Sequence, residues 1–198
     1  MIKFNNLNKD IPYRLLYQNY NEAINAGQKN IEAISISSFD NQINEVDSRF
    51  VNLKIVDNDE FIFFSNYNSP KSQQFVKHNQ ISAILYWPSI DAQIRMKAII
   101  KRTSTTFNKK YFLNRPSEKN ALAISSKQSS PIENYEDVIR NHANSLKLDN
   151  TKDCPGYWGG FTFTPYYFEF WHGHASRINK REVFKKVSND WAYSILQP

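Results

Sequence analysis

The stretch from Trp158 to Arg181, WGGFTFTPYYFEFWHGHASRINKR, constrains the fold more than any other part of the chain. Phenylalanines alternate with threonines before Pro165, and two more phenylalanines flank Glu169 after it. Alternation with a period of two, in residues rich in aromatic and β-branched side chains, predicts two short β-strands around a turn. The chain is therefore expected to build a β-sheet around this segment.

A polar segment follows the aromatic residues and carries Arg177 and Arg181. Two fixed cations beside the aromatic end of a strand suit a flat ligand that carries a phosphate. A sheet edge followed by a solvated basic loop produces the same pattern and is the more common cause. The residues of this segment alone leave both interpretations open.

Length and composition indicate a folded, soluble protein. A chain of 198 residues with 40% hydrophobic and 15% aromatic residues can bury a sizeable core. We expect residues 1–198 to form a single domain, of which residues 1–11 are mobile because they are mostly polar. No apolar run has the length of a membrane span, and the N-terminus lacks the apolar segment of a signal peptide, which together predict a cytoplasmic protein.

The remaining composition narrows the class of ligand. The chain has one cysteine, Cys154, and four histidines whose spacing matches no zinc motif, so no metal site is expected. The net charge is +6, but lysines and arginines are scattered along the chain, which argues against nucleic-acid binding. A solvated surface with a few ligand-binding cations is the simpler account, and a phosphorylated small molecule also needs such cations.

Hydrophobic periodicity and turn residues predict the other elements of the chain. Helices are expected over residues 12–26, 73–79, 106–114 and 132–148, and strands over residues 31–39, 49–54, 61–67, 81–87, 93–102 and 191–198.

Six short motifs occur in an order that resembles the pyridoxamine 5'-phosphate oxidase family. One motif is the stretch 158–181, whose WGG, EFW and SRINKR resemble the family's WGG, EFW and RLHDR, and a second is RFVNLK at 49–54, which resembles RxVLLK. The others are FSNYNSPK at 64–71, QIRMKAIIKR at 93–102, YFLNRP at 111–116 and AISSKQS at 123–129. The last motif is similar to the phenazine-biosynthesis relatives of the family. The resemblance covers roughly residues 12–198.

The resemblance implies a fold, a cofactor and an assembly. The fold is mostly β with flanking helices, a Greek-key split β-barrel that binds FMN as a homodimer. The positions that match FMN contacts are Arg49, Lys54, Phe64, Ser65, Lys71, Gln93, Gln128, Ser129, Trp171 and Arg181. Among these, Gln128 and Ser129 match a pair that reaches the FMN of the neighbouring subunit.

The resemblance also implies a substrate site. The matching positions are Lys54, Tyr111, Arg115, Lys119, Arg177 and Asn179, of which Arg177 and Asn179 are the expected catalytic pair. Three positions depart from the family pattern. Pro70 replaces an arginine, Lys119 replaces a serine, and Asn179 replaces the histidine of RLH. These departures leave the substrate open.

The implied activity is that of an FMN-dependent oxidase. It converts pyridoxine or pyridoxamine 5'-phosphate to pyridoxal 5'-phosphate with dioxygen and releases hydrogen peroxide. Two alternatives remain. One is a related FMN oxidase that acts on another flat substrate, as in phenazine biosynthesis. The other is a binding module, either a split barrel that holds flavin without catalysis or a small basic β-barrel that binds nucleic acid. Retention of Tyr111, Arg115 and Arg177 argues against a protein that only stores flavin, because FMN itself needs none of them.

Overall fold

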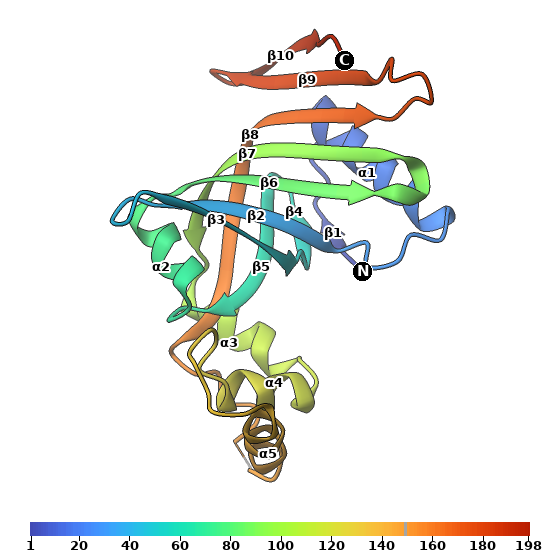
Figure 1. Cartoon of the computed structure of the whole chain (residues 1–198). Coiled ribbons are helices and arrows are strands. Elements are labelled where there is room, and N and C mark those ends of the chain that lie inside the picture. The colour runs from blue at the N-terminus through green and yellow to red at the C-terminus, as the bar shows by residue number, and fades with distance from the viewer. Residues whose placement is uncertain (149) are drawn as a thin grey trace.

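The computed structural model describes residues 1–148 and 150–198, within which ten strands form one sheet and five α-helices flank it (Figure 1). The strands are β1 (Lys3–Asn5), β2 (Ala33–Asp40), β3 (Glu45–Asn52), β4 (Ile55–Asp57), β5 (Glu60–Asn66), β6 (Gln80–Trp87), β7 (Ala92–Arg102), β8 (Trp158–His172), β9 (Lys180–Val187) and β10 (Asp190–Ile195). The helices are α1 (Ile11–Asn25), α2 (Pro70–Lys77), α3 (Thr105–Leu113), α4 (Ser117–Ser125) and α5 (Tyr135–Leu146), with a 3₁₀ turn at Pro88–Ile90. The elements predicted outside residues 158–181 are found within a few residues of their expected bounds.

The sheet runs in the order β1-β4-β5-β8-β7-β6-β2-β3, and β9 and β10 continue it from β8. Strand β8 is the central element because its two halves have different neighbours. Residues 158–163 pair with β5, residues 167–172 pair with β9, and β7 follows β8 along both halves. Figure 1 shows β8 changing direction between the two halves, which splits the sheet into two differently oriented parts.

The prediction of two short strands around a turn at Pro165 is wrong, because β8 is one bent strand. The pairing with β7 shifts at this point: Lys97 is opposite Tyr167, but Ala98 is opposite Pro165. Tyr166 is therefore the extra residue of a β-bulge, a place where a strand bends and where proline is tolerated. The β-bulge therefore causes the bend in β8 at the place where the sequence predicts a turn.

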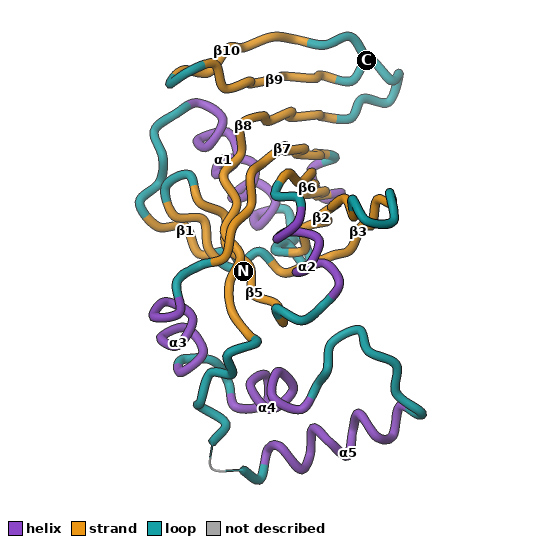
Figure 2. The backbone as a smooth tube through the Cα atoms, turned by 90° about the vertical axis from the view of Figure 1, so that its left-hand side faces the viewer, coloured by secondary structure: helices purple, strands orange, loops and turns teal. Residues whose placement is uncertain are grey.

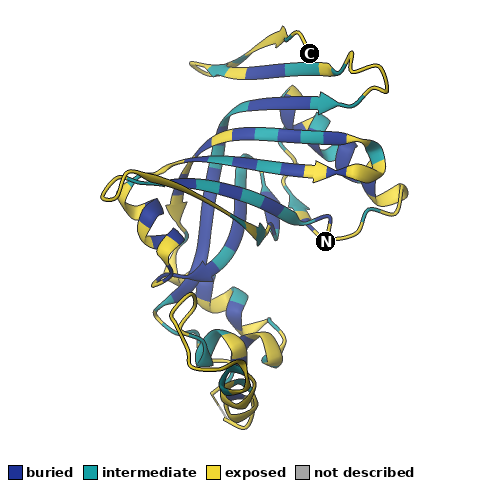
Figure 3. Ribbon diagram, viewed as in Figure 1, coloured by how far each residue is buried: buried dark blue, intermediate teal, exposed yellow. Residues whose placement is uncertain are grey.

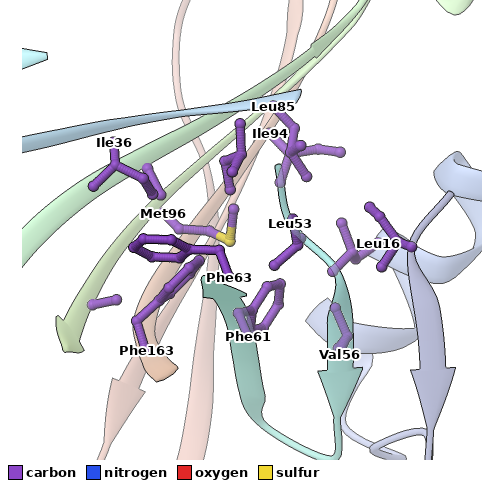
Figure 4. Packing of buried hydrophobic residues seen from close by; sticks show 14 of the residues in the cluster. Leu16, Ile36, Leu53, Val56, Phe61, Phe63, Leu85, Ile94, Met96 and Phe163 are labelled. Carbon is purple, nitrogen blue, oxygen red and sulfur yellow. The ribbon is translucent and has the colours of Figure 1, made fainter. Parts of the chain in front are cut away.

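The core lies against one face of the sheet, where alternate residues of β2, β6 and β7 are buried. Ile34 and Ile36 of β2 and Phe61 and Phe63 of β5 have no exposed surface. Figure 3 shows buried residues alternating with more exposed ones along the strands. Figure 4 shows the rings of the β5 and β8 phenylalanines beside Met96. Helix α1 covers this core with Leu16 and other buried residues at helical spacing.

Residues 1–11, which we expect to be mobile, include the short strand β1. Lys3–Asn5 pairs in parallel with Ile55–Asp57 of β4. Ile2 is buried, and its backbone N–H donates to the Tyr20 hydroxyl at 3.0 Å. The segment is polar in composition, but backbone hydrogen bonds to a distant strand order it, and no local sequence pattern reveals such a partner.

Helices α3, α4 and α5 lie beyond one end of the sheet, and the β9–β10 hairpin lies at the other end (Figures 1 and 2). Helix α4 was not predicted, because its nine residues show no clear apolar periodicity. Among the described residues, no helix combines the length and the apolar character that crossing a membrane requires.

Candidate functional site

A cleft of about 770 Å³ opens between β3, the end of β5, the start of α2, and the region of α3 and α4. Most of the cofactor and substrate residues predicted from the sequence line it: Arg49, Lys54, Phe64, Ser65, Lys71, Tyr111, Arg115, Lys119, Gln128 and Ser129. The residues come from segments spread over much of the chain. The structure therefore brings together in one place what the sequence showed only as separate motifs.

One set of cations in the cleft is built by β3 and α2. The Arg49 guanidinium donates to Ser38 Oγ at 2.6 Å and to Gln74 Oε1 at 3.0 Å, and it also pairs with Asp47. Lys71 is only 8% exposed, and its Nζ donates to Ser69 Oγ at 3.1 Å. Burial, reinforced by the nearby Arg49, lowers the pKa of Lys71 to about 8. A buried ammonium held beside a guanidinium favours an anion as the ligand.

A second cation, Arg115, follows α3. Its guanidinium lies over the ring of Trp158, 4.4 Å from the ring centroid, and donates to Asn120 Oδ1 at 3.1 Å. Burial lowers the pKa of Arg115 below its ordinary value. Tyr111 stacks on Phe64 with a centroid separation of 3.7 Å, so this side of the cleft has an aromatic wall. A flat ligand with a phosphate matches the combination of wall and cation.

The WGG motif, residues 158–160 at the start of β8, holds α3 in place. The amide group of Asn108 in α3 donates to Tyr67 Oη at 2.9 Å and accepts from the Gly160 N–H at 2.8 Å. A Cβ on Gly159 would overlap both Tyr67 Oη and Asn108 Nδ2. The helix that carries Tyr111 thus depends on the absence of a side chain at this glycine.

Gln128 and Ser129 lie in the same cleft as Arg49 and Lys71 of their own chain. Gln128 Oε1 accepts hydrogen bonds from Ser65 Oγ and from the Asn66 N–H, each at 3.3 Å. The sequence assigned this pair to the FMN of the neighbouring subunit. In the single chain both residues line the cleft of their own subunit, and their contact with the FMN of the neighbouring subunit stays a prediction.

The predicted residues Gln93, Trp171 and Arg181 form a separate row across β7, β8 and β9. Gln93 is directly opposite Trp171, and Trp171 is directly opposite Arg181. Trp158, which lines the cleft, begins β8, whereas Trp171 lies next to its other end. Measured along the bent course of β8, the two tryptophans are separated by on the order of 40 Å at about 3.3 Å per residue. The residues of the row do not line the cleft of their own chain.

The expected catalytic pair lies in the loop between β8 and β9, also outside the cleft. Arg177 has a φ of 60°, a left-handed conformation that is uncommon for this residue type, and its N–H donates to His174 O at 2.8 Å. Asn179 Oδ1 accepts from the His174 N–H at 3.0 Å. The asparagine carbonyl thus closes the loop that presents Arg177.

Curated relatives match most of the chain. A pyridoxine/pyridoxamine 5'-phosphate oxidase 1 of Hydrogenovibrio crunogenus is 33% identical over 177 residues, which cover 87% of this chain and 81% of the relative. A pyridoxine/pyridoxamine 5'-phosphate oxidase of Shewanella halifaxensis is 37% identical over 152 residues, covering 76% and 72%. The chain belongs to the pyridoxine/pyridoxamine 5'-phosphate oxidase family. Within this family member, residues 158–198 match the family model described as the pyridoxine 5'-phosphate oxidase C-terminal dimerisation region.

Solved structures confirm the split β-barrel that the sequence of this family member predicted. PhzG from Burkholderia lata, in complex with tetrahydrophenazine-1-carboxylic acid, is similar with a TM-score of 0.89 at 24% identity, over 94% of this chain and 92% of that chain. A pyridoxamine 5'-phosphate oxidase-related, FMN-binding protein from Nostoc punctiforme has a TM-score of 0.78 at 10% identity, over 95% and 98%. At these identities the likeness concerns the fold.

Two residues of this family member were not predicted as parts of the site. Trp158 was identified only as the start of the WGG motif, but its ring lines the cleft and supports Arg115. Asn108 is 4% exposed and ties α3 to β8. A tryptophan beside two glycines could have been predicted as a site residue from the sequence. Nothing in the sequence distinguishes Asn108 from any other asparagine within a helix.

The pH dependence of FMN binding is expected to report on Lys71. With a pKa of about 8 in the free protein, Lys71 loses its charge as the pH rises through that value, and a bound phosphate favours the charged form. The affinity for FMN should therefore be highest below pH 8 and fall by about tenfold at pH 9. Fluorescence titrations of the apoprotein at pH 7 and pH 9 measure this change.

The variant Lys71→Arg provides the control, because arginine remains charged over this range. Its FMN affinity should change by less than about twofold between pH 7 and pH 9. An equal loss in the wild type and in this variant would show that another group causes the pH dependence.

Proposed function

We propose that this family member is an FMN-dependent oxidase that converts pyridoxine or pyridoxamine 5'-phosphate to pyridoxal 5'-phosphate and passes the electrons to dioxygen. The observation that carries the proposal is the presence of two sets of cations in one cleft. Arg49 and Lys71 form one set on β3 and α2, and Arg115 with Lys119 forms the other at α3 and α4. A cofactor and a substrate that each carry a phosphate need two such sets.

The donors of the first set fit the phosphate of FMN. Lys71 Nζ uses one N–H on Ser69 Oγ, which leaves two for a ligand. Ser65 and Gln128 add a hydroxyl and an amide beside these cations. Pro70 also lines this part of the cleft and contributes no charge where the family pattern has an arginine.

The second set fits the phosphate of the substrate. Arg115 would bind it by charge-assisted hydrogen bonds, and Tyr111 and Lys119 would supply further donors. Anchoring the phosphate orients the rest of a flat substrate against the aromatic wall formed by Phe64 and Tyr111. Bound FMN supplies the two-electron redox chemistry, and the protein supplies orientation and electrostatics.

The remaining site residues are proposed to come from a second copy of the chain. The row of Gln93, Trp171 and Arg181 crosses β7, β8 and β9 on the face of the sheet opposite to the buried Ile94 and Phe170. Its last two members fall within the segment that matches the dimerisation region. In a homodimer, the row and the loop that carries Arg177 would complete the cleft of the partner, so that each subunit alone holds half of a site.

The test combines three measurements on the purified protein. We expect a yellow protein with a flavin absorbance spectrum, a dimer by light scattering, and hydrogen peroxide formation when pyridoxine 5'-phosphate is added under air. Failure to take up FMN would refute the proposal as a whole. A flavin-loaded monomer would refute the shared site. A flavin-loaded dimer that oxidises neither pyridoxine nor pyridoxamine 5'-phosphate would refute the substrate and favour another flat substrate.

A further inference from the structure

Glu169 lies on the outer face of β8, yet it is only 2% exposed. Its Oε1 accepts from Nε and Nη2 of Arg181 at 2.9 and 2.7 Å. Its Oε2 accepts from the Tyr167 hydroxyl at 2.9 Å and from the guanidinium of Arg95. A carboxylate offers about four acceptor positions. The protein therefore occupies all of them, and none remains for a ligand.

The strand register explains why these groups meet. Arg95 of β7 is directly opposite Glu169, and Arg181 of β9 is opposite Trp171, which is two residues further along β8 on the same face. Diagonal neighbours on adjacent antiparallel strands lie within reach of long side chains. The Arg181 side chain thus reaches diagonally from β9 to the carboxylate of Glu169.

Leu196 and Gln197, which follow β10, also form hydrogen bonds with Arg181. Arg181 Nη1 donates to Gln197 O at 3.0 Å, and the Leu196 N–H donates to Arg181 O at 3.0 Å. Three of the five N–H groups of the guanidinium are thereby committed within the chain, which leaves two for a ligand. An arginine fixed in this way loses little rotamer entropy when it binds that ligand.

The charges support the same conclusion. Burial raises the pKa of a carboxyl group, but hydrogen bonds from Arg95, Arg181 and Tyr167 outweigh burial, so the pKa of Glu169 lies below its ordinary value. The carboxylate therefore stays charged under assay conditions and keeps two guanidinium groups together. Without its charge, Arg95 and Arg181 would repel each other in a partly buried site.

We infer that Glu169 is a positioning residue that holds Arg181, together with the Gln197 carbonyl, in the orientation in which it binds FMN. The inference rests on the proposed function, because Arg181 is assigned to FMN there. Neither Glu169 nor the C-terminal residues would touch the cofactor. Their effect would be transmitted through the guanidinium alone.

The variant Glu169→Gln tests the inference, because it keeps the shape of the side chain and removes its charge. We expect the dissociation constant of FMN, measured by fluorescence titration of the apoprotein, to rise about tenfold. Glu182→Gln is the matched control. Glu182 lies on the neighbouring strand β9 and pairs with Lys180 and Tyr193, but not with Arg181, so its loss should leave FMN affinity unchanged.

A double-mutant cycle with Arg181→Gln separates positioning from a general effect on the sheet. If Glu169 acts through Arg181, the double variant should bind FMN no more weakly than Arg181→Gln alone. Additive losses, or unchanged affinity in Glu169→Gln, would overturn the inference. If Glu169→Gln fails to fold, Glu169→Asp takes its place in the test, because aspartate keeps the charge on a shorter side chain. The FMN affinity of Glu169→Asp should fall about threefold relative to the wild type. In a protein that already carries Arg181→Gln, adding Glu169→Asp should not change the FMN affinity further. A wild-type protein that binds no FMN would refute the proposed function instead.

Discussion

Replacing Arg115 by glutamine is expected to lower kcat/KM for pyridoxine 5'-phosphate by about 100-fold, through a higher KM, with the FMN affinity changed by less than about twofold. The guanidinium is half-buried over Trp158, and its donors meet only neutral acceptors of Asn120 and Lys119 among the described residues. The phosphate would be the anion that this cation lacks, and losing a charge-assisted pair of hydrogen bonds costs about 2.7 kcal/mol. Steady-state kinetics and FMN titration of the same preparation measure both effects.

The control for this prediction is Arg140→Gln. Arg140 is exposed on α5, where it pairs with Asp137 one turn away, and its loss should leave both kinetics and FMN affinity unchanged. A parallel fall of FMN affinity in Arg115→Gln would contradict the division of the cleft into two anion sites. Unchanged kinetics would contradict the assignment of Arg115 to the substrate.

Replacing Gly159 by alanine is expected to lower the free energy of unfolding by about 3 kcal/mol. The added Cβ would overlap Tyr67 Oη and Asn108 Nδ2, which are bonded to each other in a buried network. Overpacking and a broken buried hydrogen bond each cost about 1–3 kcal/mol. Urea unfolding of the apoprotein measures this difference. Catalysis should fall as well, because the same bonds hold the helix that carries Tyr111.

Gly156→Ala is the matched control for that substitution. Gly156 lies two residues before the motif, and a Cβ there would have no heavy atom within 4 Å. Its free energy of unfolding should change by less than about 1 kcal/mol. Equal stability of the Gly159→Ala and Gly156→Ala proteins would show that the WGG motif has no packing role.

The site in the cleft was largely predictable from the sequence. Residues such as Arg49, Tyr111 and Arg115 occur in short motifs whose order resembles a known family, and the structure brings them together around one cavity. Periodicity also predicted most of the strands, because alternation of apolar and polar residues is typical of a sheet with one buried face. Prediction was least accurate where a local pattern has two explanations. The segment around Pro165 reads as a turn, although it is a bulge in a continuous strand.

The cations of the site and the strands that carry many of them could be identified from residue types and their local spacing. How these residues are distributed in space depends on long-range packing. Gln128 lies in the cleft of its own subunit, and Arg181 lies on β9 opposite Trp171, near the end of β8. Glu169 accepts hydrogen bonds from arginines of two other strands. These relations depend on the register between strands that are distant in the chain. Because register results from the packing of the whole sheet, no local segment of the sequence contains it.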